Sequence, residues 1–214
     1  MSADAPPIGS RGNYDSLVPW ARQLFREGKA VDEVIRVIYG VRLPAEFYVF
    51  NRAVPSRLPL PVLHTYHPWE LLKLADPAAI VRGPDRWARR QEEHAFAHNP
   101  SFLPLMQLGA SEATHGGYTI GYDVEELRRG KSTIFGHRGD IPAGGPRLEM
   151  LGTSLLAVLH DWMSDHHRQM KAQYESPRNF GAGSLDPEDV DEIAGFVRGI
   201  VALEKETAIL EIGE

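Results

Sequence analysis

The sequence contains no cysteine among its 214 residues. This absence excludes a disulfide framework, a thiol nucleophile, and any zinc or iron–sulfur site built on thiolates. No run approaches the ~18 consecutive apolar residues of a membrane-spanning helix. The first residues, from Met1 to Pro7, lack the basic and apolar regions of a secretory signal. We therefore expect a cytoplasmic protein that does not associate with a membrane.

The overall composition is that of an ordinary globular domain. Hydrophobic residues make up 43% of the chain and charged residues 24%. A domain of this size buries roughly 70% of the surface that its unfolded chain exposes, so it needs neither a metal nor a disulfide in order to fold. The 20 glycines and 16 prolines predict short elements joined by many loops.

Negative charge is concentrated in the last third of the sequence. From residue 140 onward there are 14 Asp and Glu against 6 Lys and Arg, a net charge of −8, whereas residues 1–139 carry a net charge of +2. Nucleic-acid binding requires a basic face, so this distribution disfavours a nucleic-acid ligand. It suits a basic protein partner, although an acidic surface can also serve solubility alone.

Helical segments and short strands can both be located from the sequence. Capping residues and apolar periodicity predict helices at residues 16–27, 31–39 and 85–98, after Pro44, from Pro68 to Leu72, after an N-cap near Thr153, and after an N-cap at Asp186. Glycine-rich turns separate segments that predict an antiparallel meander: residues 102–108, 118–122 and 133–137. A short edge strand is also expected at residues 62–66.

The last two predicted helices carry the clearest apolar faces. The first face is a stripe formed by Leu151, Leu155, Leu159, Trp162, His166 and Met170. The second face comprises Val190, Ile193, Ala194, Val197, Ile200 and Val201. We expect both faces to be buried, since surface helices turn an apolar stripe toward the core.

Nine histidines make a metal site the first chemistry to consider. His94 and His98 are spaced to share a helix face, but Ala, Phe and Ala stand between them, so the glutamate of a zinc protease is missing. His64 and His67 could act only with ligands from elsewhere in the chain. These patterns predict neither a metal nor any other cofactor.

The helix after Thr153 contains a second group of histidines and acids. Helical spacing puts Asp161 and Asp165 on one face, His160 and His167 on another, and His166 on the apolar stripe. Ligands that are scattered in this way do not converge on one ion. We expect no metal here either.

Catalytic motifs are missing from the sequence. There is no Gly-x-Ser-x-Gly nucleophile, no phosphate loop and no dinucleotide fingerprint, so we expect a non-catalytic protein. Two alternatives stay open: a hydrolase that uses a histidine and carboxylate cluster, and a scaffold or regulatory subunit. In the second alternative, Trp69, Trp87 and neighbouring aromatic residues would anchor an interface.

Three segments together resemble the SUKH superfamily, which includes a fungal cell-wall-synthesis regulator and many bacterial immunity proteins. Residues 39–50, Tyr-Gly-Val-Arg-Leu-Pro-Ala-Glu-Phe-Tyr-Val-Phe, resemble its helix, Gly-x-x-Leu-Pro and short aromatic helix. Residues 117–123, Gly-Tyr-Thr-Ile-Gly-Tyr-Asp, resemble its central strand, which ends in Asp. Residues 153–162 resemble its closing helix, which opens with Ser before an apolar run.

This resemblance implies an α+β fold: a single domain over residues 14–214, with a twisted antiparallel-rich sheet packed by several helices. Residues 1–13 would be a loose N-terminal tail, residues 53–100 a helical insertion, and residues 185–214 a C-terminal helical extension. The resemblance also implies a protein without a catalytic centre that neutralises a toxin by direct binding. With the acidic charge, it predicts that a basic partner is held by Asp161, Asp165, Glu188, Asp189, Asp191 and Glu192.

Overall fold

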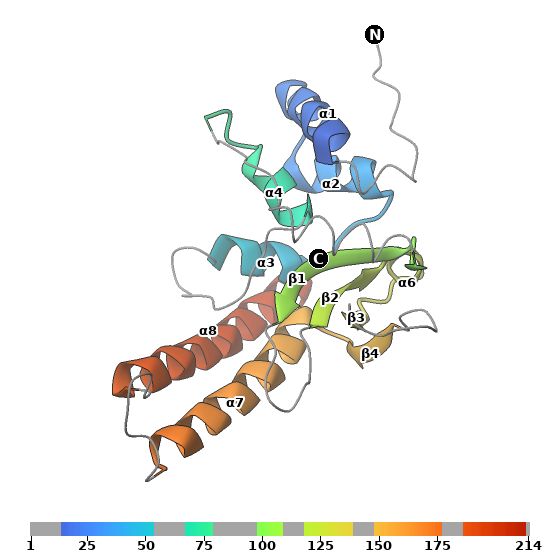
Figure 1. The fold of residues 1–214 in the computed structure, drawn as a ribbon. Coiled ribbons are helices and arrows are strands. Elements are labelled where there is room, and N and C mark those ends of the chain that lie inside the picture. Colours follow the sequence, from blue (N-terminus) through green and yellow to red (C-terminus); the bar gives the residue numbers. More distant parts are fainter. Residues whose placement is uncertain are drawn as a thin grey trace. The chain divides into compact units, whose positions relative to one another are not determined.

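The structure, a computed structural model, describes residues 14–53, 67–78, 98–108, 118–138, 148–176 and 186–212. The chain forms two compact units, each made of two separated stretches of sequence. The first unit comprises Met1–Leu43 and Val62–Leu151, and the second comprises Pro44–Pro61 and Gly152–Glu214. Figure 1 labels the helices and strands of both units. The predicted tail, the 62–66 strand and nearly all of the 85–98 helix lie outside the described residues.

Three helices of the first unit pack on one another: α1 (Tyr14–Arg26), α2 (Val31–Tyr39) and α4 (His67–Lys73). The predicted bounds of α2 are confirmed. It ends at Gly40, whose φ of 70° is left-handed and whose N–H donates to the Arg36 carbonyl at 2.8 Å. By contrast, α1 begins at Tyr14, two residues before the predicted start at Ser16. Ser16 lies in the first turn, where backbone N–H groups have no intrahelical acceptor.

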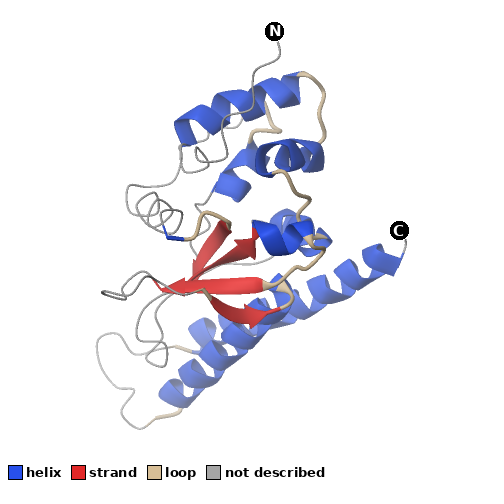
Figure 2. Cartoon of the chain, turned by 90° about the vertical axis from the view of Figure 1, so that its right-hand side faces the viewer, coloured by secondary structure: helices blue, strands red, loops and turns tan. Residues whose placement is uncertain are grey.

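A four-stranded sheet makes up much of the rest of the first unit. Its strands follow the chain order β1 (Phe102–Leu108), β2 (Tyr118–Asp123), β3 (Ile134–Arg138) and β4 (Glu149–Gly152), and Figure 2 shows them in red. The β1–β2 and β2–β3 pairs are antiparallel, which confirms the predicted meander. The sequence did not reveal β4, because four residues are too few to show a clear alternation. Its last residue, Gly152, is the first of the second unit.

A bulge in β1 explains how this strand accommodates a proline. Pro104 pairs with Gly121 and Met106 pairs with Ile120, so Leu105 is an extra residue between them. The carbonyl of Leu105 accepts a hydrogen bond of 2.5 Å from the indole Nε1 of buried Trp69. This bond ties α4 to the sheet. Trp69 is therefore a core residue of the first unit, which corrects the idea that it anchors an interface; Trp87 lies outside the described residues.

A short helix that the sequence did not reveal, α6 (Val124–Arg128), follows β2 directly. Asp123 ends the strand and caps the helix, because its Oδ1 accepts from the backbone N–H groups of Glu125 at 2.8 Å and Glu126 at 3.0 Å. Ser101 Oγ donates to the other carboxylate oxygen at 2.6 Å. Gly130, with a φ of 75°, then closes the predicted turn.

The described part of the second unit consists of three helices, α3 (Ala45–Ala53), α7 (Leu155–Tyr174) and α8 (Pro187–Ile212). Each helix contacts the other two. The helices α7 and α8 run side by side in opposite directions, and α3 lies beside the C-terminal part of α8 (Figure 1). Phe47 and Phe50 of α3 are both buried, which confirms that the helix after Pro44 contributes aromatic residues to the core.

The apolar faces of α7 and α8 are partly as predicted. On α7 the N-cap is Ser154, which confirms the cap predicted near Thr153, and the fully buried residues are Leu155, Leu156, Leu159 and Met163. The predicted Trp162, His166 and Met170 are only half-buried. On α8, Ile193 and Ile200 are buried as predicted, but Phe196 and Leu203 join them while the four other predicted residues are half-buried. On each helix, the buried residues form a face that is rotated about the helix axis relative to the predicted face, because each helix packs against two others.

The helices and the antiparallel sheet together confirm the α+β class. The chain divides into two compact units, and this division does not test whether residues 14–214 form one domain. That expectation stays a prediction. Among the described residues, no helix combines the length and the apolar content that crossing a membrane requires.

Candidate functional site

A buried carboxylate, whose role the sequence does not reveal, joins two helices of the second unit. Glu46 is only 5% exposed. One of its oxygens accepts from the N–H of Leu155 at 2.8 Å, and the other accepts from Ser154 Oγ at 2.6 Å and, more weakly, from Leu156 N–H at 3.4 Å. Ser154 Oγ itself accepts from Ala157 N–H at 3.2 Å. Glu46 thereby satisfies the otherwise open N-terminus of α7 and fixes α3 against it.

The other long helix begins with a reciprocal cap. Asp186 Oδ1 accepts from the backbone N–H of Asp189 at 3.0 Å, and Asp189 Oδ2 accepts from the N–H of Asp186 at 3.1 Å. This confirms Asp186 as the N-cap of α8. Toward the other end of α8, Glu206 pairs with Arg52 of α3 at 3.5 Å. The cap satisfies the start of α8, and the ion pair joins its C-terminal part to α3.

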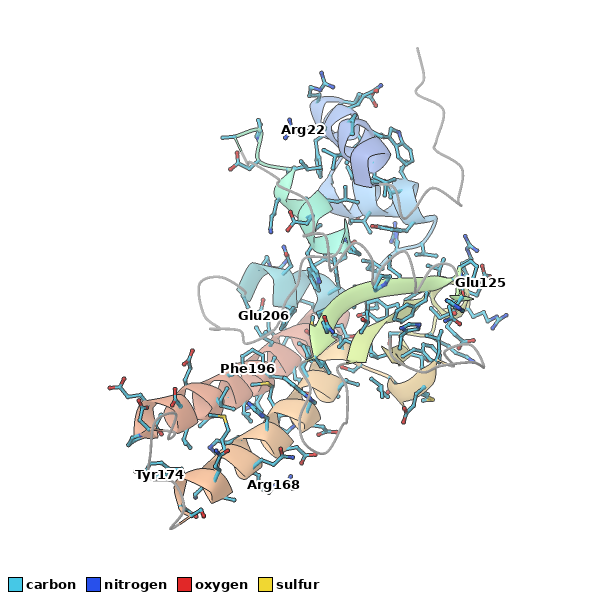
Figure 3. All side chains as sticks on the ribbon, viewed as in Figure 1. Arg22, Glu125, Arg168, Tyr174, Phe196 and Glu206 are labelled. Carbon is cyan, nitrogen blue, oxygen red and sulfur yellow. The ribbon has the colours of Figure 1, made fainter. Side chains whose placement is uncertain are left out.

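The structure places the two predicted acids of α7 on its exposed surface, each beside another polar side chain. Asp165 pairs with Arg168 at 2.6 Å. Asp161 lies 3.4 Å from the Nδ1 atom of His160. Figure 3 shows Arg168 and Tyr174 toward the C-terminal end of this helix. Since Arg168 offsets the charge of Asp165, α7 presents less negative charge than the sequence implies.

The predicted acids of α8 divide by role. Asp189 is half-buried in the cap. By contrast, Glu188, Asp191 and Glu192 are exposed, and no basic side chain of the described residues lies within ion-pair distance of them. At about 100° per residue, these three occupy an arc of about 100° on one side of the helix. They form a continuous acidic surface near the start of α8.

An exposed aromatic side chain lies at the same end of the helix pair. Tyr174, the last residue of α7, is 39% exposed. Because α7 and α8 are antiparallel, the end of α7 and the start of α8 lie at the same end of the pair. We call Tyr174, Glu188, Asp191 and Glu192 the acidic tip.

Asp161 lies apart from the acidic tip. Tyr174 follows Asp161 by thirteen positions along the helix, which at a rise of 1.5 Å per residue is about 20 Å. This exceeds the Debye length of about 8 Å at physiological salt. The structure therefore brings three of the six predicted partner-binding residues together in the tip, beside the capping Asp189, and leaves Asp161 and Asp165 outside it.

The histidines give no metal centre among the described residues, where no three His, Asp or Glu side chains are grouped to hold an ion. His98 is helical and exposed, while His94 and His64 lie outside the described residues. On α7, the ring of His166 stacks on that of Trp162, with centroids 5.8 Å apart and planes 7° apart. Burial lowers the pKa of His166, which favours its neutral form.

Comparison of this chain with protein-family models, with curated proteins and with solved structures finds no match. The resemblance to the SUKH superfamily thus stays a prediction that rests on three short segments. The elements that carry them are present: α2 ends at Gly40, β2 ends at Asp123, and α7 begins after Ser154.

Proposed function

We propose that this chain is a non-catalytic, cytoplasmic binding protein that holds a basic protein partner, such as a toxin domain, on its acidic tip. The observation that carries the proposal is the set of exposed carboxylates of Glu188, Asp191 and Glu192, which have no basic partner within ion-pair distance among the described residues. The order of elements expected from the SUKH resemblance supports the same class of protein.

The electrostatics of the helix terminus explain only one of the three carboxylates in the acidic tip. A carboxylate in the first turn interacts favourably with the helix macrodipole, and this interaction falls off within that turn. It explains Glu188, the second residue of α8. Asp191 and Glu192 lie beyond the first turn, and Glu188 with Glu192 forms a like-charge pair at i, i+4 that destabilises an isolated helix slightly. A basic partner would remove this repulsion.

The exposed ring of Tyr174 adds the second ingredient of a protein interface. Tyrosine is enriched among the residues that dominate binding energy, because it buries a large apolar area and still offers a hydroxyl group. Carboxylates around such an anchor steer a basic partner and thereby raise the association rate. The tip therefore suits fast capture of a basic protein.

The test begins with identification of the partner by pull-down and mass spectrometry from the native host. Binding kinetics are then measured at two salt concentrations for the triple variant Glu188→Lys, Asp191→Lys and Glu192→Lys. We expect the association rate at low salt to fall about tenfold or more, with a smaller change in the dissociation rate.

A matched control keeps the change in net charge the same. Glu27→Lys, Asp32→Lys and Glu125→Lys alter three exposed acids of the first unit. We expect this control to slow association by less than about twofold, because its charges lie outside the tip. Equal slowing by both triple variants, or an association rate that does not respond to salt, would contradict the proposal.

A further inference from the structure

A pocket in the first unit has a chemical character opposite to that of the acidic tip. It has a volume of about 410 Å³ and lies between the last turns of α1 and the segment that follows α4. Helix α1 contributes Arg22, Phe25 and Arg26, and the segment after α4 contributes Leu74, Asp76 and Pro77. The volume falls in the range of about 300–1,000 Å³ that small-molecule sites occupy.

Two guanidinium groups give the pocket its charge. Arg22 and Arg26 are exposed, and in the described part of the chain neither has a carboxylate within ion-pair distance. Arg26 uses its Nε to donate to the Arg22 carbonyl at 3.3 Å, which leaves its terminal nitrogens available. Figure 3 shows Arg22 on the side of α1 that faces the segment after α4.

Helix electrostatics explain only one of these arginines. Arg26 is the last residue of α1, where a cation interacts favourably with the helix macrodipole. Arg22 lies one turn earlier, and two cations at i, i+4 repel each other. An anion between them would remove the repulsion, and the planar fork of arginine matches the oxygen geometry of phosphate and carboxylate groups.

The remaining wall of the pocket is mainly apolar. Phe25 is half-buried, and Leu74 is buried. Pro77 adds a rigid apolar surface. The only acid among the described lining residues, Asp76, already accepts from the N–H of Ala78 at 2.9 Å through Oδ1. A ligand that fits these walls combines an anionic group with a small apolar ring.

We propose that this pocket binds a small aromatic anion, with Arg22 and Arg26 holding its phosphate or carboxylate group and Phe25, Leu74 and Pro77 holding its ring. This site lies in the first unit, whereas the acidic tip belongs to the second. The proposal is therefore independent of the proposed function.

Calorimetric titration of the full chain with phenyl phosphate tests the site. We expect one binding event with a dissociation constant below about 1 mM, weaker binding of inorganic phosphate, and none of benzyl alcohol. Benzoate distinguishes the two anionic groups: comparable binding assigns the site to aryl anions in general, and none restricts it to aryl phosphates. Absence of phenyl phosphate binding up to 10 mM, or equal binding of benzyl alcohol, would overturn the proposal.

Variants then assign the interaction to the pocket. Arg22→Gln and Arg26→Gln should each weaken phenyl phosphate binding about tenfold, since each removes a charge-assisted hydrogen bond. Asp76→Asn should strengthen it about twofold to fivefold by removing a like charge. Arg36→Gln is the matched control, because Arg36 is exposed on α2 and lies outside the pocket lining. Equal weakening by Arg36→Gln would show that the anion binds the basic surface non-specifically.

Discussion

In the first unit, 16 Asp and Glu are balanced by 16 Lys and Arg, whereas the second unit carries 13 acids against 7 bases. The second unit thus accounts for the whole net charge of −6. In the first unit, Glu126 pairs with Arg129 at 2.7 Å and with Lys131 at 3.2 Å. Its pKa is lowered, mainly by Lys131. The carboxylates of the acidic tip have no such basic neighbours among the described residues.

The two units also differ in how their buried polar groups are satisfied. In the first unit, Trp69 reaches the bulge carbonyl of Leu105, 36 residues away, and Asp123 caps the helix that follows it directly. In the second unit, Glu46 reaches Ser154 across 108 residues of sequence. A unit of three helices therefore depends on a contact that forms only when two distant segments meet, which makes it sensitive to a single carboxylate.

The largest expected effects come from one core substitution in each unit. Trp69→Ala and Phe47→Ala should each lower the free energy of unfolding by about 3–5 kcal/mol, as expected for a buried aromatic side chain. Amide hydrogen exchange can follow the two units separately. If residues 14–214 form one cooperative domain, either variant lowers protection in both units.

Two results would contradict this prediction. Loss of protection confined to the mutated unit would show two independent domains, and an unchanged urea midpoint of Phe47→Ala would contradict its burial. Trp69→Phe is the control for Trp69→Ala, because it keeps an aromatic ring but leaves the Leu105 carbonyl without the indole donor. Trp69→Phe should lower the free energy of unfolding by about 1–3 kcal/mol.

Removal of the Glu46 carboxylate should have the next largest effect. Glu46→Ala deprives the N–H of Leu155 of a buried acceptor, which should cost about 1–3 kcal/mol. Asp123→Ala removes a more exposed cap in the first unit and should cost about 1 kcal/mol. Urea unfolding followed by circular dichroism measures both. If Asp123→Ala proves the more damaging variant, the long-range contact of Glu46 is not a main support of the second unit.

Two glycine substitutions should change stability in opposite directions. At Gly195 of α8, an added Cβ would meet only the Arg198 side chain, at 3.7 Å, so Gly195→Ala should stabilise the protein by about 0.5–1 kcal/mol. At Gly40 the φ of 70° strains any other residue, so Gly40→Ala should destabilise it by about 1 kcal/mol. The thermal unfolding midpoints of both variants test this prediction. A midpoint for Gly195→Ala below that of the wild type would indicate a tighter environment around α8.

The smallest expected effect is a change in how the stability of the protein depends on pH. Burial lowers the pKa of His166 below its ordinary value of 6.5, so the unfolded chain takes up a proton at a higher pH than the folded chain does. The stability due to the neutral ring is therefore present above pH ~6.5 and decreases as the pH falls toward the folded-state pKa. Urea midpoints from pH 7.5 to 5 should decline less for His166→Phe than for the wild type. His167→Phe controls for the loss of an imidazole, and equal slopes for the wild type and His166→Phe would contradict the prediction.

Local patterns in the sequence were sufficient for most of the elements. The bounds of α2 follow from apolar spacing and from Gly40, whose left-handed backbone ends the helix. The strand at Phe102–Leu108 was predicted correctly for the same reason. So was the start of α8, where Asp186 is the N-cap and Pro187 the first helical residue. Each of these features depends on neighbours within a few residues, which the sequence displays directly.

Contacts between distant residues required the tertiary structure. Nothing near Glu46 in the sequence indicates that it caps α7, and the bulge that places the Leu105 carbonyl opposite Trp69 depends on how β1 pairs with β2. The same is true of the predicted acids: the sequence showed that they are concentrated near the C-terminus, but packing decided that Arg168 offsets Asp165 while Glu188, Asp191 and Glu192 are exposed. The sequence determines the amount of charge in a segment, but a charge acts over a Debye length in space, and only the fold sets the distances between side chains.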